Sequence, residues 1–209
     1  MQKIKKNLDK APHVFGRETL DKIEINEGDL VIDCGANIGE VTNYFQWRGA
    51  DVISFEPNPY AHQALKSRFR DNKKVSCLEG GVAAPHACGE KKLFLHERAK
   101  ENQITYSTGS SIKEDKNNVD KQNFIMVKII DLGKFIEGLK RPIKVLKIDI
   151  EGAEIDLLNS LIDRGQIQNI PHVFVETHEK KIPSLRKPTM LLKRRIQEEN
   201  LSNINLNWI

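Results

Sequence analysis

The chain has 209 residues, of which 39% are hydrophobic and 30% charged, and its 33 basic and 29 acidic residues leave a net charge of +4. This charge is too small to demand a nucleic-acid partner, and the length suits a single domain, residues 1–209, with a substantial core. No apolar run approaches the ~20 residues of a membrane span, the first ten residues do not resemble a secretory signal, and Cys34, Cys77 and Cys88 lack metal-ligand spacing. We therefore expect a reducing, cytoplasmic location.

The predicted elements alternate between strands and helices along most of the chain. Strands are expected at 30–34, 51–55, 75–79, 91–96, 124–130, 144–149 and 172–177. Helices are expected at 16–24, 39–47, 59–70, 131–139, 151–164 and 187–199. This alternation predicts an α/β fold with a doubly wound, mainly parallel sheet that carries helices on both faces.

Three segments stand apart from the alternation. Residues 1–28 are expected to form an N-terminal helical cap. Residues 97–122 are polar and lack apolar periodicity, which indicates either a mobile surface loop or a lid on the acceptor side of a site. The tail leaves room for one more strand near 204–209, so we expect a sheet edge that is either truncated or covered by the partner of a homodimer.

The stretch VIDCGANIG at 31–39 is an apolar strand that runs into a glycine-rich turn. Gly35 and Gly39 have no Cβ, so a ligand can approach the backbone, and the next helix directs free N–H groups into the same space. Asp33 would repel a phosphate and suits a ligand that brings a cation or several hydroxyl groups. Asn37 and Glu40 break the G-x-G-x-x-G pattern, which excludes the dinucleotide site of a nicotinamide oxidoreductase.

The second predicted strand ends in a carboxylate, Glu56, followed by Pro57, Asn58 and Pro59. Glu56 follows Gly35 by about 20 residues, the spacing of a carboxylate that binds the ribose hydroxyls of a nucleoside. The alternative is a solvated carboxylate that caps the following helix.

Acidic residues gather again near the ends of the last two predicted strands. Lys147, Asp149 and Glu151 alternate and are expected to share a face, with Glu151 beginning the next helix either as a cap or as a functional group. Glu176 and His178 follow the last strand and also share a face. Together with Asp149 they predict either an acid/base cluster, with Asp149 or His178 as the general base and Glu176 as its orienting partner, or a hard-cation site.

The motifs DCGANIG, SFEPNP, LKIDIEGAE and FVETH together resemble the FkbM family of S-adenosylmethionine-dependent O-methyltransferases, over about residues 15–178. The resemblance implies a class I, Rossmann-like fold, S-adenosylmethionine as cofactor and S-adenosylhomocysteine as product. It also implies a hydroxyl acceptor, most often on a sugar or a glycosylated product, for which a deoxyhexose such as rhamnose within a glycan is plausible.

The resemblance further implies a role for each motif residue. The methionine portion of the cofactor is expected beside the 33–39 turn, the ribose at Glu56 and the adenine at 79–82. The implied cofactor-binding residues are Asp33, Gly35, Ala36, Asn37, Gly39, Glu56, Pro57, Gly80, Gly81, Val82, Ser111, Asp149 and Glu18. For Glu18 a simpler alternative is an amphipathic turn that packs on the sheet. The expected catalytic residues are Asp149, His178, Glu176, Glu151 and Lys147, and the candidate ligands for a divalent metal are Asp149, Glu176 and His178.

Two rival functions stay open. The first is a nucleic-acid methyltransferase, because the arrangement of Lys147 and Asp149 faintly resembles that of ribose-methylating enzymes. The basic run at 193–195, however, lies beside acidic residues and favours a solvated helix face. The second rival is a nucleoside-binding domain without catalysis. A sugar acceptor is favoured because residues 97–122 carry polar side chains suited to a polyol, namely Asn102, Thr105, Tyr106, Ser107 and Ser110.

Overall fold

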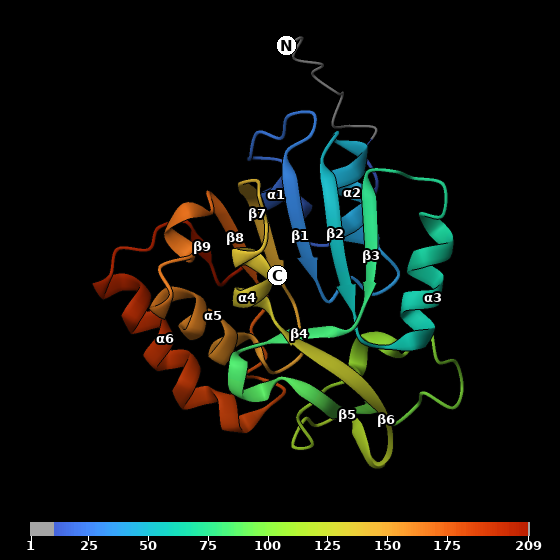
Figure 1. Cartoon of the computed structure of the whole chain (residues 1–209). Helices are drawn as coiled ribbons and strands as arrows, with labels where there is room; N and C mark the ends of the chain where they lie inside the picture. The colour runs from blue at the N-terminus through green and yellow to red at the C-terminus, as the bar shows by residue number, and fades with distance from the viewer. Residues whose placement is uncertain (1–10, 209) are drawn as a thin grey trace.

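The computed structural model describes residues 11–208 and is built on a six-stranded parallel sheet (Figure 1). The strand order is β3-β2-β1-β7-β8-β9, and every neighbouring pair is parallel. The strands are β1 (Leu30–Cys34), β2 (Asp51–Glu56), β3 (Val75–Glu79), β7 (Ile143–Ile148), β8 (His172–Val175) and β9 (Ile204–Asn205). The predicted α/β fold with a mainly parallel sheet is confirmed. The first ten residues of the expected N-terminal cap lie outside the described part of the chain.

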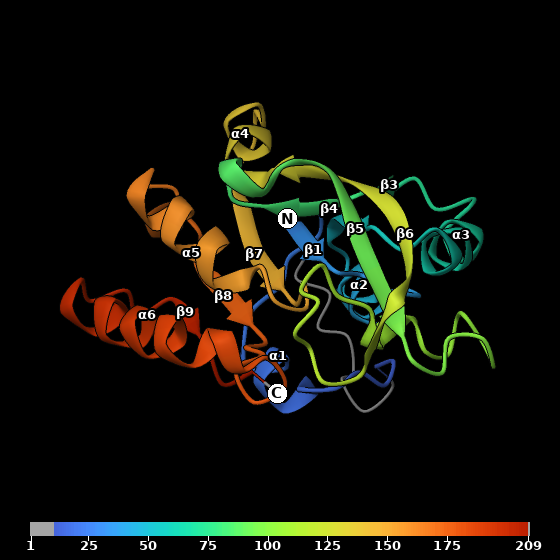
Figure 2. The same ribbon diagram turned by 90° about the horizontal axis from the view of Figure 1, so that it is seen from below.

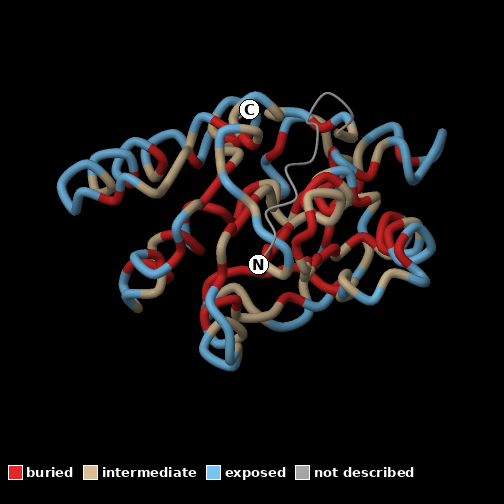
Figure 3. The backbone as a smooth tube through the Cα atoms, turned by 90° about the horizontal axis from the view of Figure 1, so that it is seen from above, coloured by how far each residue is buried: buried red, intermediate tan, exposed pale blue. Residues whose placement is uncertain are grey.

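Helices cover both faces of this sheet because its central strands are apolar on both sides. Leu30, Ile32 and Cys34 of β1 pack into one core with residues of α4 and α5, whereas Val31 packs into a second core with α2. The helices are α1 (Arg17–Leu20), α2 (Glu40–Trp47), α3 (Pro59–Arg68), α4 (Leu132–Glu137), α5 (Glu154–Asp163) and α6 (Arg186–Glu198). Figure 3 shows the buried segments at the centre and exposed backbone at the periphery. Among residues 11–208, no helix is both long and apolar enough to cross a bilayer.

A second, three-stranded sheet lies across the carboxyl ends of the main strands (Figure 2). It consists of β4 (Gly81–Ala83), β5 (Gly89–His96) and β6 (Val119–Asp131) in the order β4-β6-β5, with β5 and β6 antiparallel. The strands predicted near 91–96 and 124–130 thus belong to this sheet. The chain leaves β3 through Gly80, whose φ is +141°, and the short strand β4 that follows was not expected. This sheet closes one side of the space at the carboxyl ends of the main strands.

Two predicted helix boundaries were wrong, one because of a contact from a residue distant in sequence and one because of the local backbone conformation. The helix expected at 16–24 stops at Leu20, because Arg48 binds the carbonyls of Leu20 and Ile23 instead of leaving them to a longer helix. The helix expected from Glu151 begins at Glu154, because Glu151 and Gly152 have φ of +54° and +119°.

The extra strand expected near the C-terminus is confirmed as β9. It has two residues and pairs with β8. A strand this short limits the exposed edge of the sheet. A partner subunit over this edge stays a prediction.

Candidate active site

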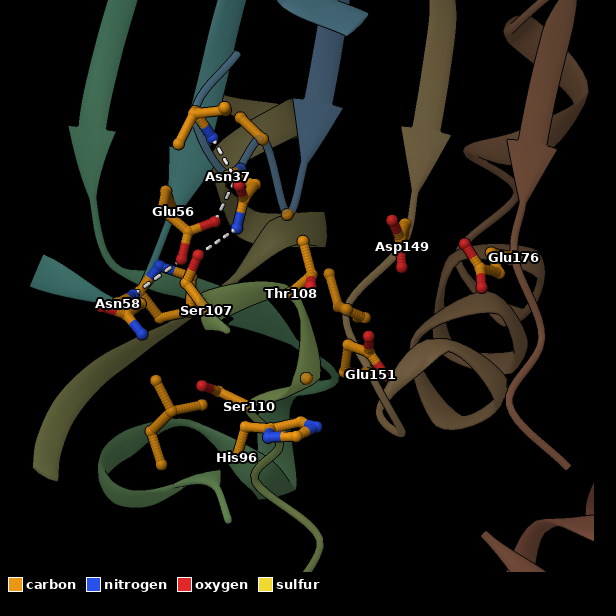
Figure 4. A pocket seen from close by; sticks show the side chains of 18 of the residues that line it. Asn37, Glu56, Asn58, His96, Ser107, Thr108, Ser110, Asp149, Glu151 and Glu176 are labelled. Carbon is orange, nitrogen blue, oxygen red and sulfur yellow. Dashed lines mark hydrogen bonds between the residues drawn. The ribbon is translucent and has the colours of Figure 1, made fainter. Parts of the chain in front are cut away.

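A cavity of about 600 Å³ lies between the two sheets, at the carboxyl ends of β1, β2 and β7. This is the usual place for a site in an open α/β sheet, and the volume suits a ligand of nucleoside size. Figure 4 shows two groups of polar side chains in it. We call one the Glu56 side (Asn37, Glu56, Asn58 and Ser107) and the other the Asp149 side (Asp149, Glu151 and Glu176).

Glu56 is a nearly buried carboxylate that faces the cavity from the end of β2. Its Oε2 accepts a hydrogen bond from the backbone N–H of Asn37 and its Oε1 accepts one from the N–H of Asn58, both at 2.8 Å. Burial raises the pKa of Glu56 to about 7, against the lowering effect of these two hydrogen bonds. The capping alternative fails, because Asn58 is the N-cap of α3 and its side chain accepts from Tyr60 N–H.

The glycines of the first turn allow other parts of the chain to pack closely against it. A Cβ on Gly35 would lie 1.8 Å from the carbonyl oxygen of Asp149, so this glycine lets the ends of β1 and β7 approach each other. A Cβ on Gly39 would lie 2.6 Å from Leu65 of α3 and from Phe69, which follows that helix. Gly35 borders the cavity, but Gly39 does not, and its expected role in ligand approach is replaced by helix packing.

Asp33 lies behind the cavity wall and is fully buried. Its Oδ1 is 3.1 Å from Lys147 Nζ, and its Oδ2 accepts a 2.7 Å hydrogen bond from Thr42. Lys147 Nζ also lies 3.5 Å from Asp149 Oδ2 and donates to the carbonyl of Gly35 at 2.6 Å. Burial lowers the pKa of Lys147, but the carboxylates of Asp33 and Asp149 outweigh it and raise that pKa above its usual range. Asp33 therefore does not contact the cavity itself, but its charge holds Lys147, which lines the cavity, in the protonated form.

His178 is surrounded by carboxylates on the Asp149 side. Its Nε2 lies 3.0 Å from Glu151 Oε2, 3.5 Å from Glu176 Oε1 and 3.7 Å from Asp149 Oδ1. Its Nδ1 is 3.2 Å from Glu154 Oε1. Burial lowers the pKa of His178, but the bonds to Glu154 and Glu176 and the charge of Glu151 raise it to about 10. An imidazolium at neutral pH cannot accept a proton, so Asp149 is the better candidate for the base.

Asp149 directly follows β7 and opens to the cavity, with its side chain 26% exposed. Burial raises its pKa to about 6; Lys147 lowers it and Glu176 raises it. A carboxyl group with this pKa is ionised at neutral pH and is still a useful base. For a cation, one atom each from Asp149, Glu151 and His178 lie within 4.8 Å of one another, so Glu151 joins Asp149 and His178 where Glu176 was expected.

The segment 97–118, which joins β5 to β6, is anchored to both sides of the cavity. Asn37 Nδ2 donates to Ser107 Oγ at 2.7 Å, and Ser111 Oγ donates to the carbonyl of Glu151. The last four residues of the predicted loop, 119–122, belong to β6. These contacts attach the segment to both sides of the cavity, and its role as a lid on the acceptor side stays a prediction.

The remaining predicted residues divide by position. Ala36, Pro57, Gly81 and Val82 line the cavity. The residues that do not line it are Gly80, Ser111 and Glu18. Glu18 is exposed on α1, while Leu20 of the same helix is buried against the sheet, as expected of an amphipathic turn.

Three residues of the site were missed. Glu154, fully buried, is the second glutamate of LKIDIEGAE and could have been suspected from its place in that motif. Lys116 and Trp208 gave no signal in the sequence. Trp208 lines the cavity from the end of the chain, with its ring 5.9 Å from Lys147 Nζ.

Comparison with known proteins agrees with this geometry. Residues 33–194 match the family described as the methyltransferase FkbM domain. The chain belongs to the FkbM methyltransferase family. The match begins at Asp33 near the end of β1 and includes all of β2, β7 and β8, so it covers the strand ends that carry the polar groups around the cavity. The family resemblance read from the sequence is therefore confirmed, and the protein is a methyltransferase.

Curated relatives of this FkbM-family methyltransferase are distant. Methyltransferase sdnD of Sordaria araneosa is 25% identical over 190 residues, covering 79% of this chain and 73% of the relative. Methyltransferase 1 of Beauveria bassiana is 27% identical over 169 residues, covering 72% of this chain and 65% of the relative. A probable ribosomal RNA small subunit methyltransferase A of Methanococcoides burtonii is 33% identical over 63 residues, covering 30% of this chain and 23% of the relative. No solved structure matches the chain significantly.

Proposed function

We propose that this methyltransferase uses S-adenosylmethionine and methylates a sugar hydroxyl. The observation that carries the cofactor assignment is the carboxylate of Glu56 at the cavity wall. Each of its oxygens accepts one backbone N–H and keeps a second lone pair, so the pair suits two ribose hydroxyls. Gly35, Asn37 and Pro57 would hold the remainder of the cofactor together with the β4 residues Gly81 and Val82.

The Asp149 side supports the chemistry of an O-methyltransferase. S-adenosylmethionine supplies, when bound, a methyl group on a positively charged sulfur. The acceptor hydroxyl must lose its proton, and Asp149 can take it with a pKa of about 6. Lys147 holds Asp149 in place, and His178 remains a charged partner of the surrounding carboxylates.

A hydroxyl-rich acceptor fits the polar groups of the segment 97–118. Ser110 Oγ and Asn118 Oδ1 belong to cavity-lining residues, are buried, and have no hydrogen-bond partner among residues 11–208. Thr105 and Tyr106 line the same cavity, whereas Asn102 holds the local turn by accepting from Ile104 and Thr105. Unpartnered buried polar atoms favour a ligand that supplies hydrogen bonds. We propose a glycan deoxyhexose such as rhamnose as the acceptor class.

A labelled-methyl transfer screen over free and oligomeric sugars tests the proposal. The expected result is label on a sugar, with S-adenosylhomocysteine as product. Label on RNA, with binding that falls steeply as salt rises, would instead support the ribose-methylating alternative. Binding of S-adenosylhomocysteine with no transfer to any sugar or RNA would support an inactive nucleoside-binding domain.

A divalent cation is a second means of activating the acceptor, since a bound metal lowers the pKa of a hydroxyl. Asp149, Glu151 and His178 are the residues that would hold it. The same screen with a chelator separates the two routes: transfer that survives chelation supports Asp149 as a simple base, and transfer that is lost and then restored by Mn²⁺ supports the cation.

A further inference from the structure

Lys116 is a buried lysine in the segment 97–118, with its side chain only 1% exposed. A buried ammonium group requires both a charge partner and hydrogen bonds. Lys116 Nζ has both, because it lies 2.6 Å from Glu151 Oε2 and donates to the carbonyl of Gly109 at 2.8 Å. The position of this lysine is therefore fixed by the turn at Gly109 within its own segment and by Glu151 outside it.

The two partners of Lys116 lie toward opposite sides of the cavity. Gly109 ends the turn Ser107–Gly109, and Ser107 Oγ accepts from the side chain of Asn37, whose backbone N–H binds Glu56. Glu151 belongs to the Asp149 side, and Figure 4 shows it across the cavity from Glu56 and Ser107. Polar contacts thus run from Glu56 through the turn and Lys116 to Glu151.

A second contact ties the same segment to the same residue. Ser111 Oγ donates to the carbonyl of Glu151, so the segment 97–118 holds Glu151 by both its backbone and its carboxylate. Glu151 has a φ of +54°, which a non-glycine residue adopts only when its surroundings enforce it. The conformation of Glu151 therefore depends on this segment.

We propose that Lys116 couples the two sides of the cavity, so that a nucleoside held on the Glu56 side also fixes the carboxylate of Glu151. Lys116 acts as a positioning residue and does not touch the reacting atoms. The inference rests on the proposed function and adds an order of events to it, in which the cofactor binds first and its binding fixes Glu151 on the Asp149 side before the acceptor binds.

A thermodynamic cycle on S-adenosylhomocysteine affinity tests the coupling by isothermal titration. The four proteins are the wild type, Lys116→Met, Glu151→Gln and the double variant. Coupling by Lys116 predicts that each single variant weakens binding about tenfold and that the double variant is no weaker than either single one. Lys113→Met is the matched control, because it removes a nearby lysine charge that is not paired with Glu151, and it should bind like the wild type within about twofold.

Hydrogen exchange of the wild type provides a test that needs no variant. S-adenosylhomocysteine should slow exchange of the Ser110 amide, which donates to the carbonyl of Ser107 on the Glu56 side, and also of the Lys116 and Gly152 amides. Protection confined to the Ser107–Gly109 turn and its neighbours, or a double variant about a hundredfold weaker than wild type, would overturn the coupling while leaving the cofactor assignment intact. Failure of the wild type to bind S-adenosylhomocysteine would refute the proposed function and the coupling with it.

Discussion

The charge of Glu56 can be tested through the pH dependence of cofactor binding. Glu56 has a pKa near 7 in the ligand-free protein, so it is ionised above pH 7 and protonated below. If only the ionised form accepts both ribose hydroxyls, affinity for S-adenosylhomocysteine should fall about tenfold for each pH unit below 7 and level off above it. Glu56→Gln should remove this dependence.

The size of the effect follows from the contacts. Hydrogen bonds to a charged group contribute about 1.5–3 kcal/mol, so loss of one bond by Glu56→Gln should weaken binding at pH 8 about ten- to hundredfold. Isothermal titration from pH 5.5 to 8.5 measures both quantities. A wild-type affinity that does not change over this range, or a variant that binds as tightly as the wild type at pH 8, would refute the ribose assignment.

Protonation of Glu56 should stabilise the folded protein although it weakens ligand binding. A carboxyl group whose folded pKa is raised favours the folded state in its protonated form. The ligand-free wild type should therefore gain stability as the pH falls from above 7 toward the ordinary glutamate value of 4.5, while its ligand affinity declines. Urea unfolding of ligand-free protein over the same pH range checks this sign.

Three further predictions follow. Asp149→Asn should leave the affinity for S-adenosylhomocysteine nearly unchanged but lower the single-turnover rate of methyl transfer at least about a hundredfold. The turnover of the wild type should rise with pH through about 6. A variant that turns over as fast as the wild type would exclude Asp149 as the base. The charged form of His178 stabilises the fold fully below pH 6.5 and loses this contribution as the pH rises through about 10. Urea unfolding from pH 8 to 10, above the range in which Glu56 titrates, should therefore show a decline in unfolding free energy that His178→Gln lacks. Gly39→Ala should cost about 2–4 kcal/mol of unfolding free energy, because the strain of a side chain at a φ of +85° adds to a clash with Leu65 and Phe69. Gly28→Ala is the control, since its φ is +78° but nothing lies within 4 Å of the added Cβ, and it should cost about 1 kcal/mol. Equal losses in the two variants would show that the structure relieves the clash at position 39.

The parts of the site that could be predicted from the sequence depend on local rules. The first turn follows from the glycines around Asn37, and the position of Glu56 follows from its distance from that turn. The burial of Asp33 behind Lys147 could not be predicted, because both lie at strand ends and only the register of β1 against β7 pairs them. Lys116 was missed for a similar reason: it lies in a polar segment without periodicity, and its partner is 35 residues away.

The fold shows the same division between local and long-range information. Apolar alternation marked β5 and β6 as strands, but their pairing in a separate sheet depends on contacts across the 97–118 connection. The length of helix α1 was overestimated because Arg48, distant in sequence, binds the carbonyl of its last residue, Leu20, and that of Ile23 beyond it.

The location of Trp208 has a practical consequence for handling the protein. Its ring is 3% exposed, packs near Phe174 and forms part of the cavity wall, although it is the second-last residue of the printed sequence. Any shortened version of this chain that lacks residue 208 would therefore lose part of the cavity wall. Samples for ligand assays should retain Trp208, and their mass should be verified before any weak affinity is interpreted.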